Sequence, residues 1–438
     1  MGGEVGDDRG KLFDRSGESP SSTCLPSSWE NQRWIPLVLL PDPLDSQREN
    51  KANPLNSICL PQRYFTPLAN MKTLPQHPCL ALGEISDRCP LILRPDSALG
   101  PTWEVKFGIM FKKGGQMENK KNDNYILLDV DTGHDDAVAI CVALALKRFE
   151  LIGITTVAGN QTVDKTTVNT LKILTLTEGT HVPVAKGCHK PLIRPLETAE
   201  EIHGETGLDG ADLPQPVVQA LEKHAVDFLR EVLLGVNEPA TIVATAPLTN
   251  LAILLLVAPE VTTKIKRIIF MGGAINKGSR TPVAESNVYV DPEAAKIVIN
   301  SGIPITMITL DITEQTAITL SELRNLLGKG SISKIFIDLL TFYAQKRYEV
   351  RGVPNVAIHD AVAAAVSIEP TLIKTQLLPV DVETEGRLTR GMTVVDRRPR
   401  TAAPSNVDVA VDIDVKLFKE ILRESFRILN TKKQNTTL

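Results

Sequence analysis

Residues Leu127 to Ala139 read Leu-Leu-Asp-Val-Asp-Thr-Gly-His-Asp-Asp-Ala-Val-Ala. An apolar run typical of a β-strand and one typical of an α-helix flank four carboxylates: Asp129, Asp131, Asp135 and Asp136. Carboxylates this close together raise one another's pKa and destabilise a fold unless a cation binds between them. Because every ligand is an oxygen, the pattern favours calcium or magnesium over zinc, which prefers His and Cys. The stretch therefore predicts a hard-metal site where a first strand meets a helix.

Helix capping is the alternative explanation for these carboxylates, since the first N–H groups of a helix attract negative charge. Asp135 or Asp136 would fill that role, but neither accounts for Asp129 and Asp131. These two alternate along the preceding strand and are predicted to share one face of it. Ligand pockets of open α/β sheets lie beyond the carboxyl ends of the strands, which also favours a binding site here.

The composition excludes several classes of protein. The formal net charge of −4 gives no electrostatic case for binding nucleic acid. The cysteines are scattered without a Cys-x-x-Cys pair, which favours ordinary thiols in a reducing compartment. No apolar run approaches the roughly 20 residues that cross a bilayer, and the acidic start lacks the basic region of a signal peptide. We expect a cytoplasmic protein with no membrane or nucleic-acid partner.

Residues 1–120 differ in kind from the rest of the chain. They are rich in Pro and Ser, and they hold all three tryptophans, Trp29, Trp34 and Trp103. Prolines recur before any helical or strand period is established, which predicts a low-order N-terminal extension rather than a packed domain. Alternatively, the stretch is mistranslated upstream sequence, because Met117 stands just before the first clear strand. The sequence leaves both explanations open.

Residues 121–438 alternate short apolar runs with longer helical ones. This alternation predicts parallel βαβ units, and the continuous apolar runs predict a sheet covered on both faces. The expected fold is an α/β domain with an open, mostly parallel, Rossmann-like sheet flanked by helices. A helix is predicted over Asp136 to Lys147, and strands are predicted over Ile126 to Val130, Leu151 to Val157, Thr241 to Thr245, Ile268 to Met271 and Ile305 to Leu310.

Polar residues of a consistent kind follow the predicted strands. The elements are Ala158-Gly159-Asn160, Ala244-Thr245, Met271-Gly272-Gly273, Ala284-Glu285-Ser286-Asn287 and His359-Asp360. Glycines let a backbone approach a ligand closely, while Asn and Glu supply directional hydrogen bonds to hydroxyl groups. No phosphate-binding loop of the Walker type is present. The predicted ligand is polyhydroxylated and uncharged.

Asp129-Val-Asp131-Thr-Gly133-His-Asp135-Asp136 resembles the DxDxGxDD signature of the inosine-uridine-preferring nucleoside hydrolases, and the later elements follow in the family's order. The resemblance covers nearly all of the chain after Tyr125, to about Lys416, and none of it before. It implies a nucleoside hydrolase fold that hydrolyses the N-glycosidic bond of ribonucleosides in purine and pyrimidine salvage. It also implies a homodimer or homotetramer.

The resemblance further implies a role for each residue of the site. Asp131, Asp136, Asp360 and the carbonyl of Thr245 would bind Ca²⁺. The ribose 2′- and 3′-hydroxyls would complete the metal shell. Asp131 would take a proton from water, and His359 would donate one to the departing base. The remaining substrate contacts would come from Asp135, Asn160, His203, Met271, Glu285 and Asn287, with Asp360 shared between metal and sugar.

Four positions depart from the family pattern. Thr132 stands where the family has Pro, and His134 stands where an apolar residue is common. Ser286 replaces a frequent aromatic beside Glu285, and Ser279 replaces a frequent Asn near the 5′-hydroxyl. The last two put substrate preference in doubt. Having both His203 and His359 favours inosine and uridine, and Tyr343 and Tyr348 are candidates to lie near the base or to pack in the core.

Two other functions fit part of the evidence. The start of the signature also resembles the DxDxT of haloacid-dehalogenase-type phosphatases, but the Asp135-Asp136 pair and the later elements oppose that assignment. A catalytically silent nucleoside-binding protein on the same scaffold is the second alternative. The retained metal ligands oppose it.

Overall fold

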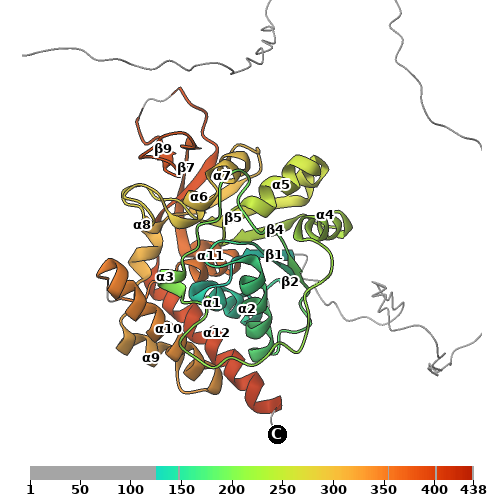
Figure 1. The fold of residues 1–438 in the computed structure, drawn as a ribbon, viewed down its shortest axis with the longest axis vertical. Helices are drawn as coiled ribbons and strands as arrows, with labels where there is room; N and C mark the ends of the chain where they lie inside the picture. The colour runs from blue at the N-terminus through green and yellow to red at the C-terminus, as the bar shows by residue number, and fades with distance from the viewer. Residues whose placement is uncertain (1–124, 147, 354, 400–401, 437–438) are drawn as a thin grey trace, which may run out of the picture. The chain divides into compact units, whose positions relative to one another are not determined.

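The computed structural model describes residues 125–438 except 147, 354, 400–401 and 437–438. The predicted extension over residues 1–120 lies outside the described residues, and so does Met117. Within the described range the chain forms an α/β domain around an eight-stranded sheet with the order β3-β2-β1-β4-β5-β6-β10-β7 (Figure 1). All neighbouring pairs of this sheet are parallel except β10 with β7. The predicted fold class is confirmed.

The strands are short, and several carry continuous apolar runs. They are β1 (Tyr125–Val130), β2 (Glu150–Thr156), β3 (Val184–Lys186), β4 (Ala240–Ala244), β5 (Ile265–Met271), β6 (Ile305–Ile308), β7 (Ile373–Leu378) and β10 (Val407–Ile413). A separate two-stranded ribbon consists of β8 (Val380–Val382) and β9 (Thr393–Val395).

Side chains alternate between two cores along each central strand. On β1, Ile126 and Leu128 pack into the larger core, while Leu127 packs into the other. Because successive side chains of a strand point to opposite faces, this alternation means that helices cover both sides of the sheet.

The larger core lies under α1 (His134–Ala145), α2 (Val163–Leu176), α9 (Leu320–Leu327), α10 (Ser331–Arg351), α11 (His359–Ile368) and α12 (Val415–Thr436). The opposite face lies under α4 (Ala225–Gly235), α5 (Thr249–Val257) and α7 (Pro292–Ile299), which Figure 1 shows grouped apart from α1 and α12. The short helices are α3 (Glu200–His203), α6 (Ser286–Val290) and α8 (Leu310–Thr313), with 3₁₀ turns over Pro259–Lys264, Glu314–Thr316 and Pro370–Leu372.

The predicted strands are confirmed with shifts at their ends. The predicted strand over Ile305 to Leu310 was too long, because β6 ends at Ile308 and Leu310 begins α8. The helix predicted from Asp136 begins earlier, at His134, because Gly133 serves as its N-cap and Asp135 and Asp136 occupy the first turn. This shift places both carboxylates at a helix N-terminus, where the helix dipole favours negative charge.

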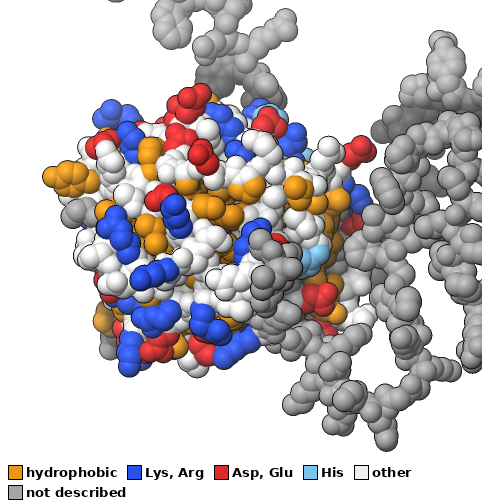
Figure 2. All heavy atoms as spheres, turned by 90° about the horizontal axis from the view of Figure 1, so that it is seen from below, with side chains coloured by type: hydrophobic (Ala, Val, Ile, Leu, Met, Phe, Trp, Pro, Cys, Tyr) orange, Lys and Arg blue, Asp and Glu red, His pale blue; other side chains and the backbone are white. Residues whose placement is uncertain are grey.

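The surface carries mixed charge. On the face in Figure 2, Lys and Arg side chains are interspersed with acidic and apolar ones. Among the residues that the structure describes, no helix combines the length and the apolar character needed to span a membrane.

Candidate active site

The predicted site residues come together at the carboxyl edge of the sheet. A pocket there is lined by Asp135, Asn160, Ala199, Ile202, His203, Thr245, Met271, Ser279, Glu285, Ser286, Asn287, Leu310, Tyr343, Arg351, His359 and Asp360. Nine of the predicted site residues are in this set, and Asp131 and Asp136 are not. Residues more than 200 positions apart in the chain therefore line one pocket, as expected for parallel strands whose carboxyl ends share an edge.

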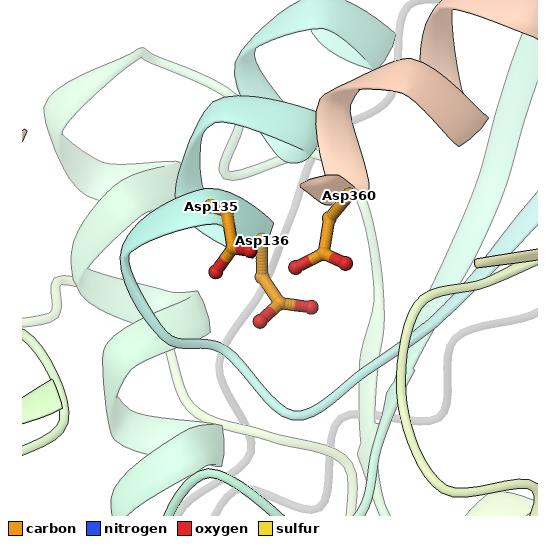
Figure 3. Close-up of side chains that lie close together, drawn as sticks. All are labelled: Asp135, Asp136 and Asp360. Carbon is orange, nitrogen blue, oxygen red and sulfur yellow. The ribbon is translucent and has the colours of Figure 1, made fainter. Parts of the chain in front are cut away.

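Three carboxylates lie together at the base of the site. Asp135, Asp136 and Asp360 are buried, and each offers an oxygen within 4.8 Å of the others. Asp135 and Asp136 come from the first turn of α1 and Asp360 from the first turn of α11, so two helix N-termini converge on the cluster (Figure 3). Burial and the neighbouring carboxylates raise the pKa of Asp360 well above its usual range. The same causes raise the pKa of Asp135 to about 7.

This donor set fits a divalent cation. A buried cluster of like charges is costly, and an ion bound by oxygen ligands offsets that cost. Asp136 is also tied into the fold, since its Oδ1 accepts from the Thr245 hydroxyl at 2.7 Å and its Oδ2 accepts from the Gly133 N–H at 3.0 Å. The capping explanation is thus correct for Asp136 in part, but it leaves Asp135 and Asp360 unexplained.

Asp131 lies beside the cluster rather than among its three closest carboxylates. Its Oδ2 accepts from the Asn160 main-chain N–H at 2.6 Å, and its Oδ1 accepts from the Asn160 amide at 3.2 Å. Burial and the charge of Asp136 raise its pKa well above the usual range. A β-carbon at Gly159 would lie 2.1 Å from Oδ2 of Asp131, so only glycine allows this close approach.

Asp129 has a structural role. Its Oδ1 accepts from the Thr155 hydroxyl at 2.6 Å and from the Asn250 amide at 2.8 Å, so it joins β1 to β2 and α5. Burial raises its pKa to about 6. Asp129 was counted with the other carboxylates of the signature, but the structure shows it supporting the sheet instead of lining the pocket.

The amides of Asn160 and Asn287 hold the edge of the site together. Asn160 Nδ2 donates to Asp136 at 3.1 Å. Asn287 Nδ2 lies 2.9 Å from the carbonyl oxygen of Thr245 and 3.0 Å from that of Met271. Since both carbonyls end neighbouring strands, the Asn287 side chain fixes their separation. The hydroxyl of Thr245 also donates a hydrogen bond to Asp136, so the residue that carries this carbonyl contacts the acidic cluster.

Glu285 is buried at the N-cap of α6. Its oxygens accept main-chain N–H groups from Gly273 at 3.1 Å, Asn287 at 2.8 Å and Val288 at 3.2 Å. Burial raises its pKa, although these hydrogen bonds oppose the shift. Ser279 and Ser286, the latter directly after Glu285, also line the pocket and add small polar side chains to it.

His359 begins α11, directly before Asp360. Its Nδ1 lies 2.7 Å from the Thr313 hydroxyl, and this is the side-chain hydrogen bond that His359 makes among the described residues. Burial, with added repulsion from Arg347 and Arg351, lowers its pKa well below the usual range. The contact with Thr313 therefore leaves Nε2 available to a ligand.

Four aromatic rings pack together at one wall of the pocket, and two of them line it. His203 and Tyr343 line the pocket, with ring centroids 5.4 Å apart. The His134 ring lies behind them, 5.4 Å from His203, 5.3 Å from Tyr343 and 5.7 Å from Phe342. Tyr348, the other tyrosine candidate, is 60% exposed and lies outside the pocket. A planar group would stack on such a wall.

Two arginines of α10 were not identified as site residues from the sequence. Arg351 lines the pocket, and Arg347 is 3% exposed with its guanidinium carbon 5.6 Å from the centre of the Tyr343 ring. Within the part of the chain that the structure describes, the Nε and Nη1 atoms of Arg347 have no hydrogen-bond partner. Tyr343, Arg347 and Arg351 follow a four-residue spacing that places them on one face of a helix. That spacing could have indicated that the two arginines lie near the pocket. A basic helix face usually points to solvent, however, so the spacing alone does not predict a site.

The chain is similar in sequence to a known protein family. A family model described as inosine-uridine preferring nucleoside hydrolase matches residues 126–420. The pyrimidine-specific ribonucleoside hydrolase RihA of Escherichia coli O7:K1 (strain IAI39 / ExPEC) is 44% identical over 304 residues, which are 69% of this chain and 98% of that protein. RihA of Salmonella schwarzengrund (strain CVM19633) is 43% identical over the same share of each chain.

Solved structures give the same result. The purine-preferring ribonucleoside hydrolase from Gardnerella vaginalis superposes with a TM-score of 0.65 at 33% identity, covering 70% of this chain and 99% of that one. The plant nucleoside hydrolase PpNRh1 superposes with a TM-score of 0.64 at 30% identity, covering 69% of this chain and 98% of that one.

These matches exclude the phosphatase alternative, because they span the whole described domain rather than its first strand alone. The chain belongs to the inosine-uridine preferring nucleoside hydrolase family, and it is a hydrolase that cleaves ribonucleosides into ribose and free base.

Proposed function

We propose that the protein is a calcium-dependent ribonucleoside hydrolase of nucleoside salvage with uridine as its leading substrate. The observation that carries the metal assignment is the buried cluster of Asp135, Asp136 and Asp360 at two helix N-termini. Asp131, Asp136, Asp360 and the Thr245 carbonyl would hold the ion. When bound, calcium supplies charge that orients a vicinal diol and acidifies a water molecule.

The side chains around the cluster suit a ribose. At the 2′- and 3′-hydroxyls, Asp135 would accept hydrogen bonds and Asn160 would donate them. Asn287, which lies beside Thr245 and Met271, would add a further contact. Glu285, already aligned by three main-chain N–H groups, would accept from the 5′-hydroxyl. Since the 2′-hydroxyl takes part, 2′-deoxynucleosides should be poor substrates.

Two residues would move protons. Asp131, held by two hydrogen bonds from Asn160, would take a proton from a water molecule beside the ion. His359 has a lowered pKa, so its protonated form is rare but is a strong acid, and its Nε2 is free to protonate the base. The buried carboxylates would stabilise the positive charge that develops on the sugar as the glycosidic bond breaks.

Relatives support uridine as the leading substrate. The RihA proteins at 43–44% identity are named pyrimidine-specific, while the Gardnerella vaginalis enzyme at 33% identity is named purine-preferring. Inosine is the second candidate, because His203 and His359 both face the pocket that would hold the base.

Release of reducing sugar from uridine, cytidine, inosine and 2′-deoxyuridine by the full-length protein tests the proposal, with bound metal assayed alongside. Ribose release that Asp131→Ala abolishes would support it. Calcium binding without turnover of any nucleoside would instead support a silent binding protein. Equal turnover of uridine and 2′-deoxyuridine would contradict the role of the 2′-hydroxyl.

We also propose that residues 1–120 form an extension separate from the catalytic domain over residues 121–438. A homodimer or homotetramer in the cytoplasm is proposed as well, on the resemblance to the family. Light scattering of the purified protein after gel filtration tests the assembly.

A further inference from the structure

His134 connects the helix that carries the carboxylates to the loop that carries His203. It is the first residue of α1, directly before Asp135, and its side chain is 1% exposed. Its Nε2 lies 2.9 Å from the carbonyl oxygen of Asp209, and its main-chain nitrogen lies 3.3 Å from Nδ1 of His203. The Nδ1 atoms of the two rings are also 3.3 Å apart.

These contacts assign the protons. A carbonyl oxygen can only accept, so His134 Nε2 carries a proton and donates to Asp209. A main-chain N–H can only donate, so Nδ1 of His203 accepts from His134. The neutral ring of His203 then carries its proton on Nε2.

In this arrangement neither Nδ1 carries a proton, so the two Nδ1 atoms meet as acceptors 3.3 Å apart, which has a cost. The opposite arrangement has a larger cost. If His203 donated from Nδ1 to the ring of His134, the main-chain N–H of His134 would lose its acceptor. As the first residue of a helix, His134 has no acceptor for this group within α1, and a buried unpaired N–H is costly. The main-chain contact therefore decides the form of His203.

The surroundings hold both rings in place. A β-carbon at Gly133 would lie 2.5 Å from Nδ1 of His203, so glycine is what lets the His203 ring approach the start of α1. Asp209 also folds its own loop, since its carboxylate accepts from the main-chain N–H groups of Glu205 at 3.0 Å and Thr206 at 3.2 Å. His134 thus attaches to an ordered turn that follows His203.

We propose that His134 is a positioning residue that fixes His203 with its proton on Nε2, free to donate a hydrogen bond to a carbonyl oxygen of the base. Among the described residues, the side-chain hydrogen bonds of His203 use Nδ1 and leave Nε2 without one, and His203 lines the pocket. Uracil, cytosine and hypoxanthine each carry a carbonyl group and adenine carries none. His134 therefore selects among bases without touching them. The inference rests on the proposed function, in which His203 faces the base.

Nitrogen NMR of the full-length protein, labelled with ¹⁵N-histidine, tests the proton assignment independently of turnover. The chain has seven histidines, and His203→Phe identifies the signals of His203 by their loss. We expect Nδ1 of His203 to resonate as an unprotonated nitrogen and Nε2 as a protonated one. The reverse pattern in the wild-type protein would overturn the proposal.

Kinetics of His134→Leu, His203→Phe and the double variant test the positioning role, with exposed His181→Leu as the matched control. We expect His134→Leu to lower kcat/KM for uridine by roughly tenfold, the value of one hydrogen bond. The loss should be much smaller for 4-nitrophenyl riboside, which offers no base carbonyl. In the His203→Phe background, the second substitution should cost little more.

The outcomes distinguish a failure of the role proposed for His134 from a failure of the proposed substrates. Additive losses in the double variant, or equal losses on uridine and 4-nitrophenyl riboside, would show that His134 acts only on folding and would overturn the proposal. If the wild-type protein cleaved 4-nitrophenyl riboside but no nucleoside, the proposed substrates would be wrong. The NMR pattern would still decide the proton on His203.

Discussion

Removing calcium should make the stability of this protein fall as the pH rises. Burial, and then the charge of Asp136, raise the pKa of Asp135 from 3.8 to about 7. Because the folded protein holds this proton more tightly than the unfolded chain, protonation stabilises the fold. That stability is fully present below about pH 4 and is lost as the pH rises through about 7.

The size of the stability loss follows from the shift in the pKa of Asp135. Each pKa unit corresponds to about 1.4 kcal/mol, so the rise from 3.8 to about 7 means a loss of roughly 4 kcal/mol for Asp135 alone. Calcium should offset much of the loss, since its charge beside Asp135 favours the ionised form of that carboxyl. At a free concentration a hundredfold above its Kd, a ligand adds about 2.7 kcal/mol to the free energy of unfolding.

Thermal unfolding followed by circular dichroism tests this, in EDTA and in calcium, from about pH 5 to about pH 8. In EDTA the midpoint should fall by several degrees across this range, and in calcium it should stay nearly level. Asp135→Asn is the matched control, because it removes the charge and should flatten the EDTA curve. Equal pH dependence of wild type and Asp135→Asn in EDTA would refute the reasoning.

Three further predictions follow from the site. His359→Ala should lower kcat for uridine far more than for 4-nitrophenyl riboside, whose leaving group needs no proton; equal losses in steady-state assays would contradict the role of His359. Ser286→Phe should lower the KM for uridine about threefold to tenfold by adding an aromatic wall to the ribose pocket, and an unchanged or raised KM would argue against it. Deleting residues 1–120 should leave kcat/KM for uridine and the unfolding midpoint unchanged, and a loss of either would show that the extension supports the domain.

Much of the fold could be predicted because its signals are local. The strand over Tyr125–Val130 and the helix after Gly133 are each marked by a continuous apolar run of a few residues. The position of β10 could not be predicted in this way. It lies between β6 and β7 in the sheet, although more than 90 residues separate it from β6 in the sequence. Strand order depends on long-range packing, which a local pattern does not encode.

The site was predicted where residue chemistry is distinctive and missed where it is ambiguous. Carboxylates, amides and glycines at strand ends indicated the pocket, and nine of the eleven predicted site residues line it. Arg347 and Arg351 were missed because their helix also carries exposed charges such as Lys346 and Glu349. The contact of His134 with His203 spans 69 residues and depends on a loop geometry that no spacing reveals.

The place of β10 also has a consequence for synthesis on the ribosome. β7 bonds to the sheet only through β10, so β6 and β7 both present unpaired edges until residues 407–413 have emerged. Exposed strand edges recruit other chains. A chain that stopped before this segment would carry two strand edges open to other chains, so the sheet of the described domain is closed only when β10 has been made.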